Sequence, residues 1–359
     1  MHKQEEFTLN KIEQYGWNSN WQEKAAAPGI PGRVTLEHKH LYRVVTENGE
    51  WLSSLSGKFK HEHGHQEFPS VGDWVMVEQM PGEEKGIIHR VLPRSSQFSR
   101  KSAGDTSEIQ TIAVNIDYVF LVMSLNHDFN VRRLERYLIA SWDSGANPIV
   151  VLTKKDQCAD IEPYMKEVES VAFGVPVHAV SSVTGEGIDE LQKILAGAKT
   201  GALLGSSGVG KSSLINALSG SELMAVQGIR EDDSKGRHTT THRELVLLPT
   251  GGLLIDTPGM REFQLGDYSE GMETSFSDVE TLADACRFRD CSHGNEPGCA
   301  IQEALAAGEL PRDRYQSYLK LKRELAHMER KSDLAAQKAE RSKWKQVTKD
   351  YRKRPVKKR

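Results

Sequence analysis

The eight residues from Gly205 to Ser212 have the composition and spacing of a phosphate-binding loop. They follow the pattern G-x-x-x-x-G-K-[ST], between an apolar run that predicts a strand and the segment 213–218, which predicts an amphipathic helix. Glycines let successive backbone N–H groups turn toward phosphates, Lys211 supplies a cation for the outer phosphates, and the Ser212 hydroxyl can bind Mg2+. The residues expected around the phosphates are Gly205, Ser206, Ser207, Gly208, Val209, Gly210, Lys211, Ser212 and Ser213.

A second motif predicts recognition of the base. It consists of Thr153, Lys154, Lys155 and Asp156. The Asp156 carboxylate can accept two hydrogen bonds from the ring N–H and the amino group of guanine, whereas adenine offers no matching pair of donors. Thr153 stands where asparagine is usual in such motifs. Ser181 and Ser182, at the end of another apolar run, are expected to support the base edge, so the predicted ligand is GTP or GDP with Mg2+.

Two later segments predict a nucleotide switch. Asp256, Thr257, Pro258 and Gly259 end an apolar run, which puts the Asp256 carboxylate at a strand tip facing the metal and lets Gly259 offer an N–H to a terminal phosphate. The segment 236–241, Gly-Arg-His-Thr-Thr-Thr, precedes this turn. In such switches a threonine hydroxyl completes the Mg2+ shell only when the γ-phosphate is present. Thr240 is the expected ligand, with Thr239 as the alternative.

Hydrolysis requires a group that orients the attacking water. Ras-like enzymes use a glutamine directly after the Asp-x-x-Gly motif, but this chain has Met260 there, so we expect slow intrinsic turnover. His238, beside the switch threonines, is the candidate catalytic residue together with Lys211 and Thr240. Arg237 is an alternative source of positive charge, and a solvated His238 without a catalytic role is the competing interpretation.

The order of these motifs is informative in itself. The base motif precedes the phosphate loop, whereas the phosphate loop comes first in an ordinary GTPase. The chain therefore has the motif order of a GTPase domain that is circularly permuted.

A cluster of cysteines after the switch region predicts a metal site. Cys286, Cys291, His293 and Cys299 offer three thiolates and an imidazole in a short loop that is rich in Gly and Pro. This set matches a structural Zn2+ site of the Cys3His type, in which the protein fills all four positions. A reduced loop without a metal is the alternative interpretation.

These residues must be positioned by regular elements. Apolar runs at 118–122, 148–152, 176–180 and 201–204 alternate with helical patterns at 131–142, 161–172 and 187–195. This alternation predicts a parallel, doubly wound α/β sheet that places its ligand at the carboxyl ends of the strands. Further helices are expected at 301–307 and 312–331.

The segment 33–93 has a different pattern, with short β-type runs separated by Gly, Asn and Pro. About five short strands predict a small barrel. An OB-fold, which commonly holds oligonucleotides, is the leading interpretation; an SH3-like barrel and a barrel that is only a spacer are the alternatives. The polar connector 94–111 is either a solvated linker or a nucleic-acid contact.

The two ends of the chain differ in composition. Residues 1–32 are polar with scattered aromatic residues, a composition that suits an extension or a short helix followed by a linker, and they are expected to be loosely ordered. Between 341 and 359, ten basic residues face the single acid Asp350, and Trp344 and Tyr351 could stack on bases. RNA is the favoured partner of this tail, and a solubilising role is the alternative.

Overall composition predicts a cytoplasmic protein. The 50 acidic and 47 basic residues nearly balance, and the chain begins without an apolar signal core. The longest apolar runs are too short to span a bilayer, so no membrane partner is expected. A long heptad pattern is not seen, so a monomer is the default. DNA is not an expected partner.

These motifs together resemble the RsgA family of circularly permuted, ribosome-associated GTPases. The likeness covers roughly residues 33–330 and includes the permuted order, the segments 236–241 and 256–263, Val71-Gly72-Asp73 and the cysteine cluster. It implies docking on the 16S rRNA of the 30S subunit late in maturation, with hydrolysis stimulated by the mature subunit. It also implies that His238 positions water. The expected domains are an extension (1–32), an OB-fold barrel (33–95), a linker (96–111), a permuted P-loop GTPase domain (112–268), a helical zinc-binding domain (269–335) and a basic tail (336–359).

Overall fold

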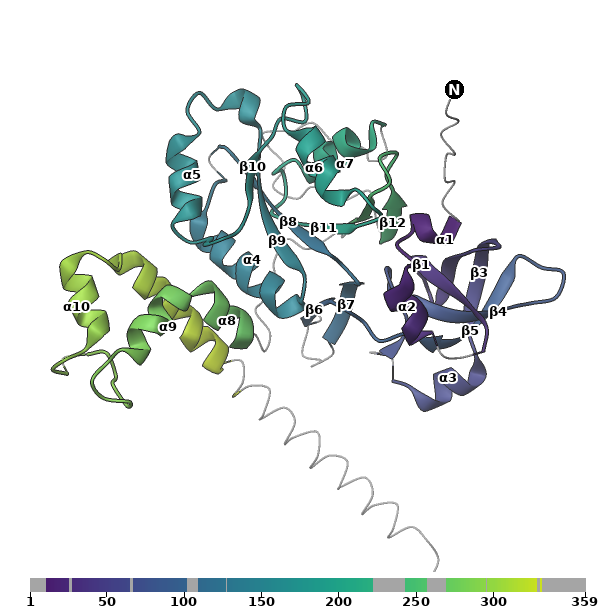
Figure 1. The fold of residues 1–359 in the computed structure, drawn as a ribbon, viewed down its shortest axis with the longest axis horizontal. Helices are drawn as coiled ribbons and strands as arrows, with labels where there is room; N and C mark the ends of the chain where they lie inside the picture. The colour runs from purple at the N-terminus through teal and green to yellow at the C-terminus, as the bar shows by residue number, and fades with distance from the viewer. Residues whose placement is uncertain are drawn as a thin grey trace, which may run out of the picture. The chain divides into compact units, whose positions relative to one another are not determined.

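The computed structural model describes residues 11–25, 28–64, 67–101, 109–126, 128–221, 243–256, 269–294, 296–327 and 330 (Figure 1). Its contacts divide the chain into two compact units. The first contains residues 1–100 and 110–263, and the second contains residues 101–109 and 264–359. Among the described helices, none is long and apolar enough to cross a membrane.

The larger unit contains the predicted parallel sheet. Its strands lie in the order β10 (Val177–Ala179), β9 (Asn147–Thr153), β8 (Tyr118–Ser124), β11 (Thr200–Leu204), β13 (Leu253–Asp256) and β12 (Glu244–Leu247). The first five are parallel, and β12 pairs antiparallel with β13. The strand that enters the phosphate loop, β11, is therefore central and lies next to β8 and β13, although residues far apart in sequence supply these neighbours.

Helices cover both faces of this sheet. The helices α4 (Val131–Ser144) and α5 (Glu162–Glu169) pack on one face, and α6 (Ile188–Leu195) and α7 (Lys211–Ser219) on the other. The side chains of β8 alternate accordingly: Val119 and Leu121 join the α4 core, whereas Phe120 and Val122 join the α6 core. Because both faces are buried, these strands are almost continuously apolar.

A five-stranded barrel precedes the sheet. It is formed by β1 (Ile30–His38), β2 (Leu41–Thr46), β3 (Gly49–Leu55), β4 (Trp74–Gln79) and β5 (Lys85–Val91), with α3 (Gly57–Glu62) between β3 and β4. The pairing order is β1-β2-β3-β5-β4, and β4 closes the barrel on β1. The strands β3 and β5 are parallel. This closed Greek-key order is that of an OB-fold and excludes the SH3-like alternative.

The barrel and the parallel sheet are joined within the larger unit. Leu36 of β1 pairs with Glu244 of β12, and the Arg43 guanidinium lies 3.0 Å from the Glu244 carboxylate. Arg33 of β1 is only 2% exposed and makes further connections. Its guanidinium donates to the carbonyl oxygens of Tyr15, Gly72 and Asn115 and to Thr200 Oγ1 of β11. One side chain thus contacts the N-terminal segment, the barrel and the sheet.

The N-terminal segment corrects an expectation. The prediction of a loosely ordered extension is wrong for residues 11–25, which form α1 (Lys11–Gln14) and α2 (Ser19–Lys24). Ile12 and Trp21 are buried, and the Trp21 ring lies 5.9 Å from that of Trp74 on β4. The side chain of Asn18 caps α2 by accepting from two backbone N–H groups. The barrel also begins earlier than expected, since β1 starts at Ile30.

The connector 94–111 is not a solvated linker in its described part. Its residues contribute to β6 (Gln97–Lys101) and β7 (Ile109–Val114), which pair with each other. Phe98 is buried. Arg94 donates to both carboxylate oxygens of Asp73, at 2.9 and 2.7 Å, and to the carbonyl of Phe68. Burial raises the pKa of Asp73, and the Arg94 hydrogen bonds oppose that shift. Arg94 is therefore a structural residue of the barrel.

The smaller unit is helical. It contains α8 (Ser269–Ser275), α9 (Ser277–Asp284), α10 (Ala300–Ala307) and a helix over 312–327. Phe276 and Tyr318 are buried with ring centroids 5.5 Å apart. Arg314 bridges α9 and the last helix by donating to both Asp278 oxygens and to the Ser275 carbonyl. This small core holds the loop that carries the cysteine cluster.

Candidate functional site: a nucleotide site and a Cys3His centre

The phosphate loop connects β11 to α7, as predicted. Gly205 directly follows the strand, and a Cβ added there would lie 2.4 Å from the Val122 carbonyl oxygen, so no other residue allows this approach of loop and β8. Gly208 and Gly210 have φ angles of +78° and +97°, in the left-handed region. Lys211 begins the nine-residue α7. The loop thus leads into a helix N-terminus, where backbone N–H groups favour an anion.

The ammonium of Lys211 is held over the loop. Its Nζ donates to the carbonyl oxygens of Gly205 and Ser206, both at 2.6 Å. Ser212 and Ser213 follow on the first turn of α7 and are partly exposed. The lysine and the serine hydroxyls therefore occupy one end of the helix, where a phosphate chain and its metal ion could be bound.

The base motif contacts the phosphate loop directly. Thr153 Oγ1, in a residue 2% exposed, lies 2.5 Å from the carbonyl oxygen of Val209 and 3.2 Å from that of Met123. Lys154 has a left-handed φ of 63°, and its Nζ donates to the Gly208 carbonyl at 3.0 Å. Two motifs more than 50 residues apart in sequence therefore meet at the carboxyl ends of β9 and β11. The threonine hydroxyl makes this connection from the position where an asparagine amide is usual.

Asp156 is exposed and oriented by a serine. It lies in the short 3-10 helix Lys155–Gln157, and the buried Ser181 hydroxyl donates to its Oδ1 at 2.6 Å. The same Ser181 oxygen accepts from the N–H groups of Val183 and Thr184. Ser182 is partly exposed beside it. The predicted role of Ser181 near the base is consistent with a side chain that holds the Asp156 carboxylate and leaves its other oxygen open to a ligand.

Two further contacts were not predicted from the sequence. Lys155 Nζ lies 2.6 Å from the Glu186 carboxylate, which fixes the lysine stem beside the base motif. Arg133, on the first turn of α4, donates to Asp128 Oδ2 at 2.8 Å and to the hydroxyl of Ser206 in the phosphate loop. No local pattern marks Arg133 or Glu186, because 73 and 31 residues separate them from their partners.

The predicted switch residues lie largely outside the described part of the chain. This applies to Arg237, His238, Thr239, Thr240, Thr257, Pro258, Gly259 and Met260, and to the basic tail. The backbone of Asp256 is described as the last residue of β13, next to β11 in the sheet. The strand therefore ends on the same edge as the phosphate loop.

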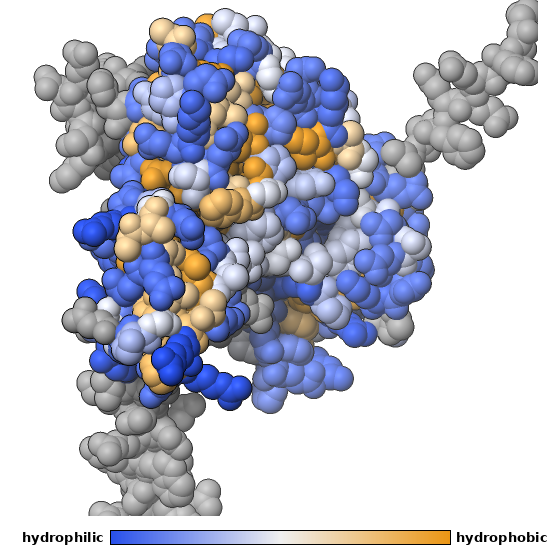
Figure 2. All heavy atoms as spheres, turned by 60° about the vertical axis from the view of Figure 1, so that its left-hand side comes forward, coloured by the Kyte–Doolittle hydropathy of each residue, from blue (hydrophilic) through white to orange (hydrophobic). Residues whose placement is uncertain are grey.

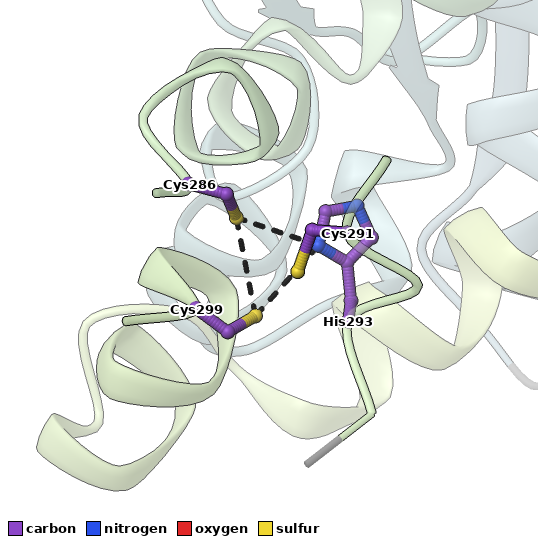
Figure 3. Close-up of side chains that lie close together, drawn as sticks. All are labelled: Cys286, Cys291, His293 and Cys299. Carbon is purple, nitrogen blue, oxygen red and sulfur yellow. Dashed lines mark hydrogen bonds between the residues drawn. The ribbon is translucent and has the colours of Figure 1, made fainter. Parts of the chain in front are cut away.

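The four predicted metal ligands come together (Figure 3). Their ligand atoms all lie within 4.8 Å of one another. Cys286 Sγ is 3.9 Å from Cys299 Sγ and 3.5 Å from His293 Nδ1, and Cys299 Sγ is 3.7 Å from that nitrogen. Two thiolates held about 2.3 Å from one tetrahedral zinc ion lie about 3.8 Å apart. The observed spacing fits such an ion.

The loop around these ligands is supported by hydrogen bonds. His293 adopts a left-handed φ of 59°, a conformation that is uncommon outside glycine but in which asparagine, aspartate and histidine are enriched. Gln302 donates to the His293 carbonyl at 2.6 Å. Glu296 accepts from the hydroxyl and N–H of Ser292 and from the N–H of Gly294, and these bonds lower the pKa of Glu296 to about 2. The loop is thus shaped to hold the imidazole toward the thiolates.

The sequence of this chain is similar to those of known GTPases. The sequence model described as RsgA GTPase matches residues 91–266. The small ribosomal subunit biogenesis GTPase RsgA 1 of Listeria innocua is 51% identical over 342 residues, covering 95% of this chain and 97% of that protein. The protein of the same name from Oceanobacillus iheyensis is 43% identical, covering 89% and 92%.

Two solved structures share the fold. YjeQ from Thermotoga maritima has a TM-score of 0.62 and 28% identity, covering 83% of this chain and 98% of that chain. YloQ, described as a circularly permuted GTPase, has a TM-score of 0.61 and 25% identity, covering 83% and 95%. The permuted order predicted from the motifs is therefore confirmed.

Proposed function

This chain belongs to the RsgA GTPase family and is a GTP-hydrolysing enzyme of small ribosomal subunit biogenesis, and from this premise we propose how its residues perform that task. The main support for this proposal is the contact of Thr153 and Lys154 with the phosphate loop. Because this contact sets the base motif at a fixed place relative to the loop, one nucleotide can be held at both ends. The same motifs have a competing interpretation, an RNA-binding module or chaperone that uses guanine nucleotide only as a structural ligand. The names of the relatives do not favour it.

Asp156 selects guanine in this proposal. The Ser181 hydroxyl occupies one carboxylate oxygen and orients the group. The carboxylate then accepts from the ring N–H and the amino group of guanine. Because adenine has no such pair of donors, ATP leaves the acidic group unpaired and binds weakly. Ser182 and the stem of Lys155 line the same edge.

Lys211, the loop N–H groups and the N-terminus of α7 bind the phosphates. The nucleotide competes with the Gly205 and Ser206 carbonyl oxygens for the Lys211 ammonium. Arg133 keeps its contact with Ser206 and so braces the loop from the α4 side. Ser212 and Thr240 would hold Mg2+, which would neutralise phosphate charge. Asp256 and Gly259 complete the switch, and His238 orients the attacking water.

We propose Zn2+ as the metal of the Cys3His centre and a structural role for it, since the protein supplies all four ligands.

The proposed partner is the 30S subunit, which the barrel and the basic tail contact through 16S rRNA. Ordering of the switch by GTP strengthens this contact, and hydrolysis weakens it. The protein acts as a monomer in the cytoplasm, where small subunits mature.

The test is GTP hydrolysis by the purified protein alone, with 30S subunits and with 50S subunits, and with ATP as the nucleotide control. We expect slow turnover alone and a large stimulation by 30S only. Lys211→Ala should abolish the stimulated rate, because the phosphates lose their cation. Equal stimulation by both subunits, or none by either, would contradict the proposal. Binding to 30S should also be tighter with a non-hydrolysable GTP analogue than with GDP.

A further inference from the structure

Large apolar side chains are few on the described part of the surface. On the face drawn in Figure 2, hydrophilic residues predominate and hydrophobic ones lie between them. In the described ranges, the exposed large apolar side chains are those of Leu41, Leu52, Met80, Phe173, Val183 and Phe288. Phe288 differs from the others because an arginine precedes it and another follows it, and because it lies in the loop between two metal ligands, Cys286 and Cys291.

The backbone of this loop is fixed on both sides of Phe288. Cys286 and Cys291 end the loop at the metal centre. The N–H of Arg287 donates to the Gly298 carbonyl at 3.0 Å, and the N–H of Cys291 donates to the Phe288 carbonyl at 3.3 Å. These bonds pair the N–H groups of Arg287 and Cys291 and the carbonyl of Phe288. The side chains at 287, 288, 289 and 290 are exposed, so the loop presents one aromatic ring between two arginines, followed by the acid Asp290.

The tip of this loop, formed by Arg287, Phe288 and Arg289, has charges that are available to a partner. The Arg287 guanidinium lies over the Phe288 ring, 5.5 Å from its centroid. Within the part of the chain that the structure describes, neither Arg287 nor Arg289 forms an ion pair. The ring itself is 44% exposed. An aromatic ring with flanking arginines combines a stacking platform for a base with cations for the adjoining phosphates.

We propose that Arg287, Phe288 and Arg289 form a binding site for single-stranded RNA, in which an unpaired base stacks on Phe288 and the arginines contact neighbouring phosphates. This inference rests on the proposed function, since the RNA belongs to the small subunit. Charge complementarity favours RNA over a protein partner, because the exposed residues 287–290 carry two arginines against the single acid Asp290, with one flat apolar ring between the arginines. The metal centre supplies the rigidity that makes stacking favourable.

The experiment uses full-length, zinc-loaded protein with a non-hydrolysable GTP analogue. Affinity is measured for 30S subunits and for a single-stranded RNA 12-mer at several salt concentrations. Phe288→Ala should weaken both by on the order of 10-fold without changing the salt dependence. Arg289→Gln should lower the slope of log affinity against log salt by about 0.7 for the 12-mer. Zinc content reports that each variant keeps its fold.

Matched controls make the result specific. Phe173→Ala removes an aromatic ring that is 56% exposed, and Arg323→Gln removes an exposed charge on the helix 312–327. Both should leave RNA affinity unchanged. Equal losses from Phe173→Ala or Arg323→Gln would overturn the site, since they would indicate a general surface effect. A loss of 30S affinity without a loss for the 12-mer would assign the tip to a ribosomal protein and overturn the RNA proposal.

The failure of this inference differs from the failure of the proposed function. If 30S subunits stimulate the wild-type enzyme and Phe288→Ala binds 30S and the 12-mer as tightly as wild type, the tip proposal is wrong and the function stands. If 30S subunits do not stimulate the wild-type enzyme, the function is wrong, and the 12-mer measurements alone decide whether the tip binds RNA.

Discussion

Thr153 connects the base motif and the phosphate loop, the two halves of the proposed nucleotide site, with a single hydroxyl. It lies within hydrogen-bonding distance of the Val209 and Met123 carbonyl oxygens in a buried position. Thr153→Val keeps the shape of the side chain and leaves a buried carbonyl without its donor, so we expect a loss of about 1–3 kcal/mol in the free energy of unfolding. GDP affinity should fall as well, because the phosphate loop loses its contact with the base motif. Urea unfolding and equilibrium nucleotide binding measure the two effects.

Thr153→Ser is the matched control for this prediction. It retains the hydroxyl, so GDP affinity should stay near that of wild type, apart from the small packing loss of one methyl group. A Thr153→Val variant that binds GDP as tightly as wild type would show that the phosphate loop is positioned without this hydrogen bond.

Asp156 offers a test of base selection. In Asp156→Asn, the amide presents one acceptor and one donor in place of two acceptors, so guanine loses a hydrogen bond and faces a donor–donor clash. We expect GTP affinity to fall by at least 100-fold. Xanthosine triphosphate, which has a carbonyl where guanine has its amino group, should bind the variant better than GTP does. Competition binding with GTP, xanthosine triphosphate and ATP decides the matter, and unchanged GTP affinity would place the base elsewhere.

At the scale of the elements, the loop of the Cys3His centre can be tested by removing one of its cysteines. Cys299→Ser removes one of four ligands, so we expect the zinc content to fall from one ion per chain and the smaller unit to lose helix. Metal analysis and far-UV circular dichroism measure both. Cys158→Ser is the control, because Cys158 lies outside the cluster, with its Sγ 3.2 Å from the Asp160 carbonyl. Full zinc content in Cys299→Ser would contradict the assignment of this ligand.

Elements that leave a pattern within a few consecutive residues could be predicted from the sequence. The expected strands at 118–122, 148–152 and 201–204 are confirmed as β8, β9 and β11, with ends that differ by at most two residues. Burial on both faces makes each of them a nearly unbroken apolar run. The grouping of Cys286, Cys291, His293 and Cys299 could be predicted for the same reason, since the first and the last are thirteen positions apart.

Contacts between distant segments could not be predicted in this way. Trp21 belongs to a polar stretch, and the burial of its ring depends on Trp74, which lies 53 positions later on β4. The role of Arg133 likewise depends on the parallel pairing of β8 with β11, which brings α4 to the phosphate loop. Neither the contact of Trp21 with Trp74 nor the pairing of β8 with β11 leaves a pattern within a few consecutive residues. A single sequence therefore predicts helices and strands better than it predicts which of them contact one another.

The larger unit as a whole depends on Arg33. Burial lowers the pKa of this guanidinium to about 10, still far above neutral pH, so the group is charged where the N-terminal segment, the barrel and β11 meet. Arg33→Met should cost at least about 3 kcal/mol in unfolding free energy, because several buried acceptors lose their donor. It should also separate the unfolding of barrel and sheet into two transitions. Scanning calorimetry measures both effects.

Arg43→Met is the control for Arg33. Arg43 pairs with Glu50 and Glu244, but its side chain is 41% exposed, so its loss should cost no more than about 1 kcal/mol and leave one transition. A single cooperative transition in Arg33→Met would show that the pairing of β1 with β12 is enough to hold the barrel and the sheet together.

The strand order also has a consequence for how the protein is synthesised. The barrel and the strands β8, β9 and β10 leave the ribosome first, and the strands β11, β12 and β13, which lie between them in the finished sheet, follow afterwards. During translation, β8 therefore exposes an unpaired edge to other nascent chains until residues 200–256 arrive. The last strands close this gap and build the phosphate loop in the same step, so guanine nucleotide can be bound across both halves only when translation has passed the central strand.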